Sequence, residues 1–189
     1  MLKKNKIYKG EYGYIKYQRK MEIIKTIILL ALSVGLYVLG FLTTGSNKNL
    51  LTFVAILGVL PMARFAISAV LFIRANGCSE ESFVKIVSAG VAVDYYDLYM
   101  TSYDKNFALS ASLLKHDCFV AFTEDEKMDI AACETHIKGI LKNCGGESIS
   151  VKVYNDLDKF TERLRELSQF DNDTKNSEFI RDNILNVSI

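Results

Sequence analysis

The chain has 189 residues, of which 50% are hydrophobic and 24% are charged, with a single proline and no tryptophan. This composition excludes disordered and collagen-like proteins, and four cysteines are too few for a disulfide-rich scaffold. The net charge of +1 is unevenly distributed: it is +6 over residues 1–25, +2 over 26–73 and −7 over 74–189. The chain therefore consists of a basic, an apolar and an acidic part.

Residues 1–25 form a basic segment in which tyrosines are interleaved with lysines and arginines. Aromatic rings with a polar tip suit the headgroup layer of a membrane, and cations beside them favour anionic lipid. The sequence predicts a juxtamembrane segment on the inner leaflet, with lipid-facing candidates Lys9, Tyr12, Tyr14, Lys16, Tyr17, Arg19 and Lys20. A solvated terminus that only sets the topology explains the same cluster equally well.

Residues 26–73 are predicted to form a transmembrane hairpin. Residues 26–43 carry no charge, and residues 50–73 form a second apolar run that only Pro61 and Arg64 interrupt. Eighteen residues at about 1.5 Å each nearly cross a hydrocarbon core of roughly 30 Å. A signal peptide would begin nearer the terminus and would not be followed by a second span. The excess of basic residues before the first span then predicts a two-pass protein of the cell membrane, with both termini in the cytoplasm.

Two residues of the second span are candidates for a role in the membrane. Pro61 removes a backbone donor and is expected to bend the helix near Leu57. Arg64 is a costly cation inside a span, so it is a candidate for a pathway or an oligomer contact. The alternative is that Arg64 lies near the inner surface, where its long side chain extends to the headgroups.

Residues 78–170 are predicted to form a cytoplasmic α+β domain, and residues 171–189 a polar linker at 171–176 followed by a weak helix near 179–185. Ser79 caps the first helix, whose expected apolar stripe is Phe83, Val84 and Val87. A capping box at Thr123 opens a second helix that ends at 145–146, and Asn155 or Asp156 caps a third. The expected strands are 91–103, 107–114, 118–123 and 148–154. The order is helix, three-strand meander, helix, strand and helix.

This order of elements resembles the common core of restriction-endonuclease-like nucleases. The resemblance implies an acidic residue on the second strand and an acid-x-Lys triplet on the third. The third strand here reads CFVAFTED and lacks that triplet, and only Asp104 and Lys115 lie near a suitable place. Because the domain is acidic, it is also a poor partner for phosphates, and nucleic acid is not an expected ligand.

Other candidate chemistry is explained more simply by structure. His116 with Cys118, and Cys133 with His136, supply nitrogen and sulfur ligands, but their spacing fits no zinc motif. Asp94 and Asp97 are three residues apart on an expected strand, so their side chains would point to opposite faces. The acidic run at 124–129 fits a helix N-terminus. No metal, cofactor or catalytic residue is therefore predicted.

The sequence favours a membrane-anchored module that acts by binding, as a scaffold or regulatory subunit, over an enzyme. Its expected partners are the lipid bilayer and either a second copy of the chain or another membrane protein. Two alternatives remain open: a membrane-tethered enzyme with a degenerate nuclease-like fold, and an oligomeric hairpin that forms a pore with Arg64 facing inward.

Overall fold

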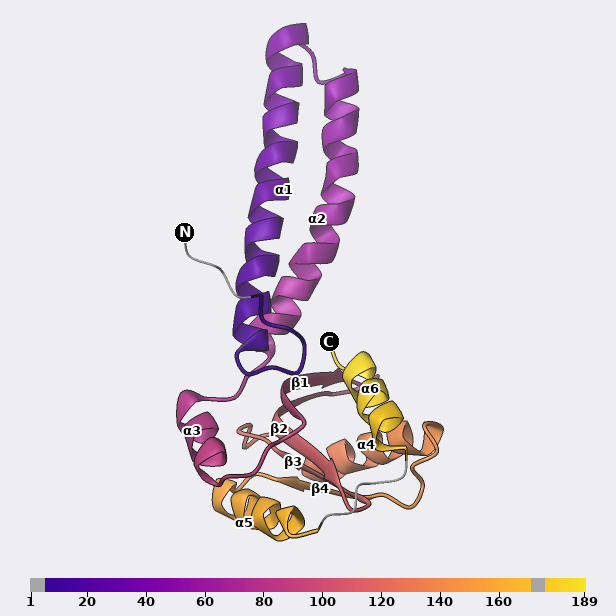
Figure 1. The fold of residues 1–189 in the computed structure, drawn as a ribbon. Coiled ribbons are helices and arrows are strands. Elements are labelled where there is room, and N and C mark those ends of the chain that lie inside the picture. Colours follow the sequence, from indigo (N-terminus) through magenta and orange to yellow (C-terminus); the bar gives the residue numbers. More distant parts are fainter. Residues whose placement is uncertain (1–5, 171–175) are drawn as a thin grey trace. The chain divides into compact units, whose positions relative to one another are not determined.

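The computed structural model describes residues 6–170 and 176–189. This part of the chain divides into two compact units, each considered by itself: one joins the residues up to Tyr14 with Asn76–Ile189, and the other is Ile15–Ala75. Of the predicted linker at 171–176, all but Asn176 lies outside the described residues. The expected hairpin and α+β domain are both present (Figure 1).

The apolar unit consists of two helices, α1 (Tyr14–Thr44) and α2 (Leu50–Arg74). Both are long and apolar enough to cross a membrane. The first is longer than its uncharged run, because it begins twelve residues earlier, within the basic segment. Asn49 caps the second by accepting the amide of Thr52, and α2 continues through Pro61.

Small side chains let the two helices approach each other closely. Ser33, Gly40, Ala55 and Ala69 are buried within a pair in which most large apolar side chains are exposed. A methyl group on Gly58 would lie 2.8 Å from Ser33 Oγ, so a larger residue here would force the Ser33 hydroxyl to turn away. Close packing of this kind is the usual contact between helices in lipid, where apolar surface gains little from burial.

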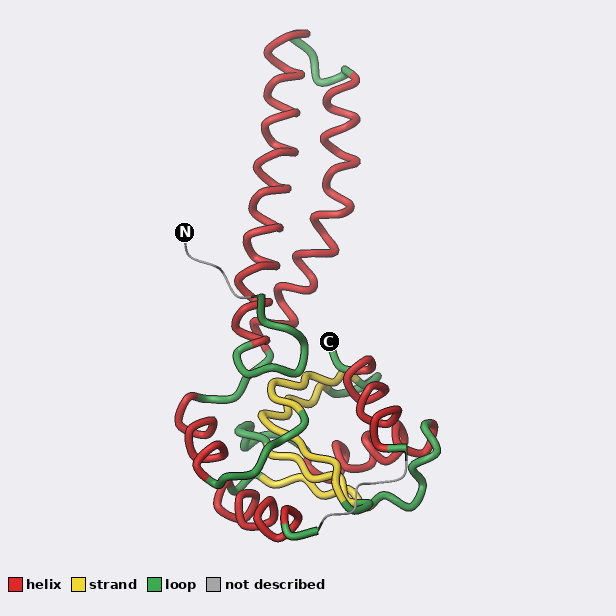
Figure 2. Tube along the Cα trace, viewed as in Figure 1, coloured by secondary structure: helices red, strands yellow, loops and turns green. Residues whose placement is uncertain are grey.

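The second unit is a four-stranded sheet with helices on both faces (Figure 2). The strands β1 (Tyr95–Thr101), β2 (Asn106–Lys115) and β3 (Cys118–Phe122) form an antiparallel meander. The fourth strand, β4 (Ser150–Tyr154), pairs parallel to β3, and α4 (Ile130–Asn143) connects the two. The strand order is β1-β2-β3-β4. The first three strands are the predicted meander, and the crossover through α4 adds β4 beside β3.

Two apolar clusters hold the helices to the sheet. One contains Ile137 of α4 and Ile180 of α6 (Ser177–Val187). The other contains Ile86 of α3 (Glu80–Ser88) and Phe160 of α5 (Leu157–Ser168). Helices α4 and α6 therefore cover one face of the sheet, while α3 and α5 cover the other (Figure 1).

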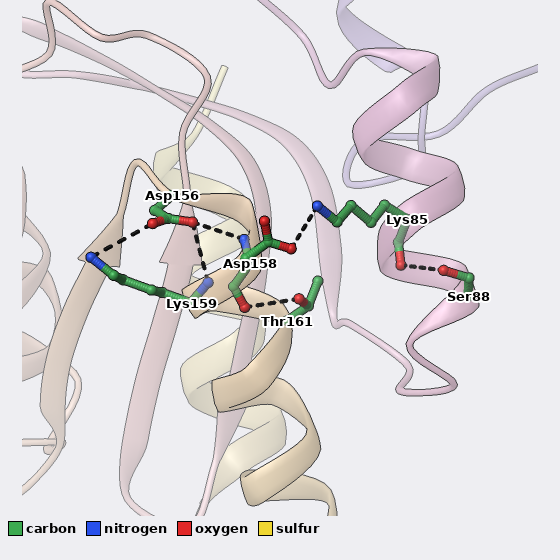
Figure 3. A network of polar contacts seen from close by, with 6 residues as sticks. All are labelled: Lys85, Ser88, Asp156, Asp158, Lys159 and Thr161. Carbon is green, nitrogen blue, oxygen red and sulfur yellow. Dashed lines mark hydrogen bonds and ion pairs between the residues drawn. The ribbon is translucent and has the colours of Figure 1, made fainter.

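A polar network joins α3 to α5 at the surface. Lys85 Nζ lies 2.6 Å from the carboxylate of Asp158, and Asp156 caps α5 by accepting the amides of Asp158 and Lys159 (Figure 3). The side chains of Lys85 and Asp158 are 44% and 79% exposed, so this ion pair adds at most about 1 kcal/mol. The apolar contacts of Ile86 and Phe160 are therefore the main attachment between the two helices.

Two local predictions within the sheet unit are wrong. The capping box at Thr123 does not open a helix: Asp129 caps α4 by accepting the amide of Ala132, and Thr123 Oγ1 instead donates to the Ala108 carbonyl at 2.8 Å. The Thr123 oxygen also accepts the amide of Asp125 at 3.1 Å, so this hydroxyl holds the turn before α4 and does not cap the helix. The apolar stripe of α3 is also displaced, because Ile86 points inward.

In that helix the two valines of the expected stripe lie on the outer face. Val84 and Val87 are 58% and 53% exposed, whereas Ile86 is fully buried and Phe83 is half-buried. A short helix offers only two turns, so the hydrophobic pattern alone does not fix which side faces the sheet.

Candidate functional site

The carboxylate of Asp97, in the central part of β1, is a buried polar group of the sheet unit. Its residue is only 1% exposed and adopts a left-handed backbone with φ 55°. One oxygen, Oδ2, accepts the amide of Gly13 at 2.9 Å, and the other, Oδ1, accepts the amide of Cys78 at 2.6 Å. Hydrogen bonds to an ionised group are stronger than neutral ones, and burial strengthens them further.

The two segments that Asp97 holds have a special place in the chain. Gly13 immediately precedes α1, and Cys78 follows the end of α2 by four residues. One buried carboxylate thus ties together the chain entering the hairpin and the chain leaving it. We call this group, with the aromatic residues around it, the Asp97 cluster: Tyr12, Gly13, Cys78, Phe83, Tyr96 and Asp97.

Glycines allow both segments to come this close. A methyl group on Gly77 would lie 3.0 Å from Asp97 Oδ1. Gly10 has φ 87°, a methyl group there would lie 2.6 Å from the Tyr95 ring, and its carbonyl accepts the amide of Tyr96 at 2.8 Å. Gly13 also has a positive φ, of 84°. The glycines of YKGEYGY, the nearest feature in this chain to phosphate-loop glycines, therefore serve tight turns and close approach to β1.

Aromatic rings cover the cluster. Tyr12 stacks on Phe83 of α3 with ring centroids 3.9 Å apart, and Phe83 meets Tyr96 of β1 edge-on at 5.2 Å. Burial raises the pKa of Tyr96 to about 12, and the nearby Cys78 adds to this shift.

Both ends of the described chain lie along the free edge of β1. Gly10 accepts from Tyr96, and the amide of Ile189 donates to the Tyr99 carbonyl at 2.8 Å. The ammonium of Lys9 donates to the Ser188 carbonyl, which links the two end segments to each other. An exposed strand edge can pair with a strand of another chain. Here the hydrogen bonds of Gly10 and Ile189 use backbone groups on the free edge of β1.

The acidic residues flanking the cluster have structural partners. Asp94 accepts the Leu114 amide at 2.6 Å and lies 2.9 Å from Arg181 Nε. Glu124, expected at a helix N-terminus, instead accepts the amide of Ser79 at 2.9 Å. Asp94 and Asp97 therefore accept hydrogen bonds from different backbone amides and do not share one site.

The lipid-facing candidates divide between the two units. Lys9, Tyr12 and Tyr14 belong to the sheet unit, where Lys9 and Tyr12 make the contacts just described, whereas Lys16, Tyr17, Arg19 and Lys20 lie in the first turns of α1 within the hairpin. Arg19 has a defined role within the hairpin: its guanidinium donates to the carbonyls of Phe72 and Ala75 at 2.9 and 2.7 Å, at the end of α2. Lipid contact of the remaining candidates stays a prediction.

Arg64 and Pro61 are both exposed on α2, and Arg64 makes no hydrogen bond or ion pair with any residue that the structure describes. Lys25 of α1, which pairs with Glu22 at 2.6 Å, lies over the ring of Phe65 at 5.3 Å. Arg64, the neighbour of Phe65, thus lies level with Lys25, the last charged residue before the uncharged part of α1. This position favours the reading in which Arg64 extends to the headgroups.

The residues considered for nuclease or metal chemistry are not brought together. Asp104 precedes β2 and Lys115 ends it, so a strand of ten residues, about 30 Å long, separates them. Cys133 of α4 is fully buried in the apolar cluster between the sheet and helices α4 and α6. His116 stacks on Phe170 with ring centroids 4.3 Å apart. Over residues 6–170 and 176–189, no group of three or more His, Cys, Asp or Glu side chains has metal-binding geometry.

Sequence reasoning missed the role of Asp97 and the capping role of Arg19. The signals for Asp97 were Gly10, Gly13 and Gly77, which mark places where backbone passes close to another group. Neither family models nor curated proteins match the sequence, and no solved structure matches the fold. The likeness to restriction-endonuclease-like nucleases therefore remains one of element order.

Proposed function

We propose that the chain is a membrane-anchored regulatory or binding module, in which α1 and α2 cross the bilayer as a hairpin and the sheet unit acts in the cytoplasm. One observation carries this proposal. The segment before α1 and the segment after α2 pack into the same unit through Gly13, Cys78 and Asp97.

The packing of these segments constrains the topology. Two segments that pack against each other lie on the same side of a membrane, so the helices between them cross it twice or not at all. The length and hydropathy of both helices support two crossings. The eight Lys and Arg residues before the uncharged run, against Lys48 alone between the helices, support a cytoplasmic location for the unit.

The Asp97 cluster supports a regulatory role. A movement of the chain entering α1 relative to the chain leaving α2 would have to stretch or break the bonds of a buried carboxylate in the central part of β1. The two segments that lead into and out of the hairpin are thereby held by one group of the sheet unit. Partners that bind the hairpin, such as a second copy or another membrane protein, would act on the sheet through this coupling.

The anchoring role is tested by replacing residues 15–75 with a flexible Gly/Ser linker. The contact of Arg19 with the Ala75 carbonyl brings the two ends of the hairpin close together, so a linker on the order of ten residues is long enough. We expect the shortened protein to leave the membrane fraction and to remain folded and soluble. Retention in carbonate-washed membranes would show that residues outside the hairpin anchor the chain.

The coupling is tested by hydrogen exchange of the full chain in bilayers of two thicknesses. A thinner bilayer tilts or shifts the helices, so the amides of Gly13 and Cys78 should exchange at different rates in the two bilayers. The amide of Ala132 in α4, which donates a hydrogen bond to Asp129, is the reference and should exchange at the same rate in both bilayers. Equal rates at Gly13 and Cys78 in both bilayers would contradict the coupling.

A further inference from the structure

A polar groove lies between the edge strand β4 and helix α5, away from the Asp97 cluster. Its volume is about 430 Å³. The lining combines a thiol and a hydroxyl with cationic and anionic side chains, among them Cys118, Ser150, Lys152, Lys159, Arg163 and Glu166. The fold explains the groove, because Ser150 and Lys152 alternate along β4 on the α5 side, while Val151 and Val153 point into the opposite cluster.

The sulfur of Cys118 lines the groove, with a hydroxyl and a guanidinium beside it. Ser150, its partner in the β3–β4 register, places Oγ 3.0 Å from the sulfur and 3.3 Å from the Asp117 carbonyl, so these two acceptors share the hydroxyl proton, and Arg163 Nη2 lies 3.8 Å from the sulfur. A sulfur that carries negative charge during attack or departure is stabilised by such donors. Glu166 binds the same guanidinium at 2.6 Å, which holds it in place and weakens its field.

The other cysteines provide a comparison within the same chain. Cys78 and Cys133 are buried, and Cys118 and Cys144 are half-buried. Cys144 ends α4, and within the described residues its sulfur accepts no hydrogen bond. Cys118 and Cys144 are therefore more accessible to a reagent than Cys78 and Cys133. Of the two accessible thiols, Cys118 lines the charged groove and Cys144 does not.

We propose that this groove is a thiol-modification site, in which Cys118 forms a mixed disulfide with a small disulfide that carries both carboxylate and ammonium groups. Lys152 and Lys159 lie 3.6 Å from Glu134 and Asp156, which do not line the groove, and are 61% and 71% exposed, so both can turn to the carboxylates of a ligand. Arg163 adds a third positive charge, and Glu162 and Glu166 suit the ammonium groups. A ligand with both charges fits this lining better than a simple anion, because two acids share the groove with the three cations.

The reaction is thiol–disulfide exchange. The Cys118 thiolate attacks one sulfur of the small disulfide, a new S–S bond forms, and the original S–S bond breaks. The departing half leaves as a thiolate and takes a proton from water. Cys118 is oxidised and one half of the small disulfide is reduced, so the incoming disulfide is the only oxidant. This inference does not rest on the proposed anchoring or coupling.

The test uses the full chain in detergent, with oxidised glutathione as the probe and mass spectrometry to follow each cysteine. We expect Cys118 to be modified at least about fivefold faster than Cys144, and both faster than the buried thiols. Cystamine, which carries ammonium groups only, should reduce this preference. Equal rates at Cys118 and Cys144, or the same preference with both probes, would overturn the proposal.

Two variants separate the groove from general exposure. Arg163→Met removes the donor to the sulfur and should slow modification of Cys118 while leaving Cys144 unchanged. Lys159→Met removes a groove cation that is 71% exposed and makes no contact with the sulfur, so it keeps the fold and should lower the preference for oxidised glutathione over cystamine. Unchanged rates and preferences in both variants would refute the site.

Discussion

Replacing Asp97 by Asn is the sharpest perturbation of the sheet unit, because it exchanges one oxygen for an NH₂ group and preserves the shape. Asn also tolerates the left-handed backbone that position 97 adopts at φ 55°, so the substitution adds little backbone strain. In the native protein Oδ2 accepts a hydrogen bond from the amide of Gly13, and Oδ1 accepts one from the amide of Cys78. The Asn side chain can satisfy only one of them.

The free-energy cost of the substitution comes from the buried amide that loses its acceptor. A buried donor left without an acceptor costs about 1–3 kcal/mol, and the loss of the charge weakens the bond that survives. A local loss of about 2 kcal/mol corresponds to roughly 30-fold faster hydrogen exchange. We therefore expect the amide of Gly13 or of Cys78 to exchange roughly 30-fold faster in Asp97→Asn than in the native protein.

Hydrogen exchange followed by mass spectrometry on peptides covering residues 10–14 and 76–79 measures this effect. Asp104→Asn is the matched control: it makes the same chemical change at an exposed residue of the β1–β2 turn, and neither peptide should respond. Exchange in Asp97→Asn within about threefold of the native rate would show that the carboxylate does not hold the two segments.

Three further changes test other parts of the structure. Arg19→Met removes two hydrogen bonds to the end of α2 and should cost about 1–3 kcal/mol locally, seen as faster exchange of the Ala75 amide; Lys20→Met on the outer side of α1 is the control, and equal exchange would exclude the capping role. Burial raises the pKa of Cys133 to about 12 from an unfolded value of 9.0, so its neutral form stabilises the fold fully below pH 9, and this contribution is lost as the pH rises towards 12. Cys133→Ala, although less stable at neutral pH, should lose stability less steeply between pH 9 and 11 in denaturant titrations, and parallel curves would contradict the buried thiol. Arg64→Leu should leave both membrane insertion and the size of the detergent-extracted complex unchanged, whereas a smaller complex would favour the oligomeric pore.

The sequence predicted the parts of the fold that depend on long patterns. The uncharged run at 26–43 and the alternation of apolar strands with turns persist over many residues, and lipid or a closed core leaves few other structures for them. The order of helices and strands in the sheet unit followed from the same patterns.

Features that depend on tertiary partners could not be predicted locally. Thr123 bonds the Ala108 carbonyl, which is brought beside it only when β2 and β3 pair. Tyr96 and Leu98 lie two residues apart, yet they pack into clusters on opposite faces, because the left-handed Asp97 reverses the alternation of β1. Simple strand periodicity assigns both residues to one face.

The most direct test of the anchored hairpin is thiol labelling of intact cells. In the proposed topology, the loop between α1 and α2 lies outside the cell, and the unit that holds Cys118 and Cys144 lies inside. A membrane-impermeant thiol reagent should therefore label an introduced Ser46→Cys at once and should reach Cys118 and Cys144 only after permeabilisation. Labelling of Cys118 or Cys144 in intact cells, or protection of the cysteine at position 46 until permeabilisation, would contradict the topology on which the proposed function depends.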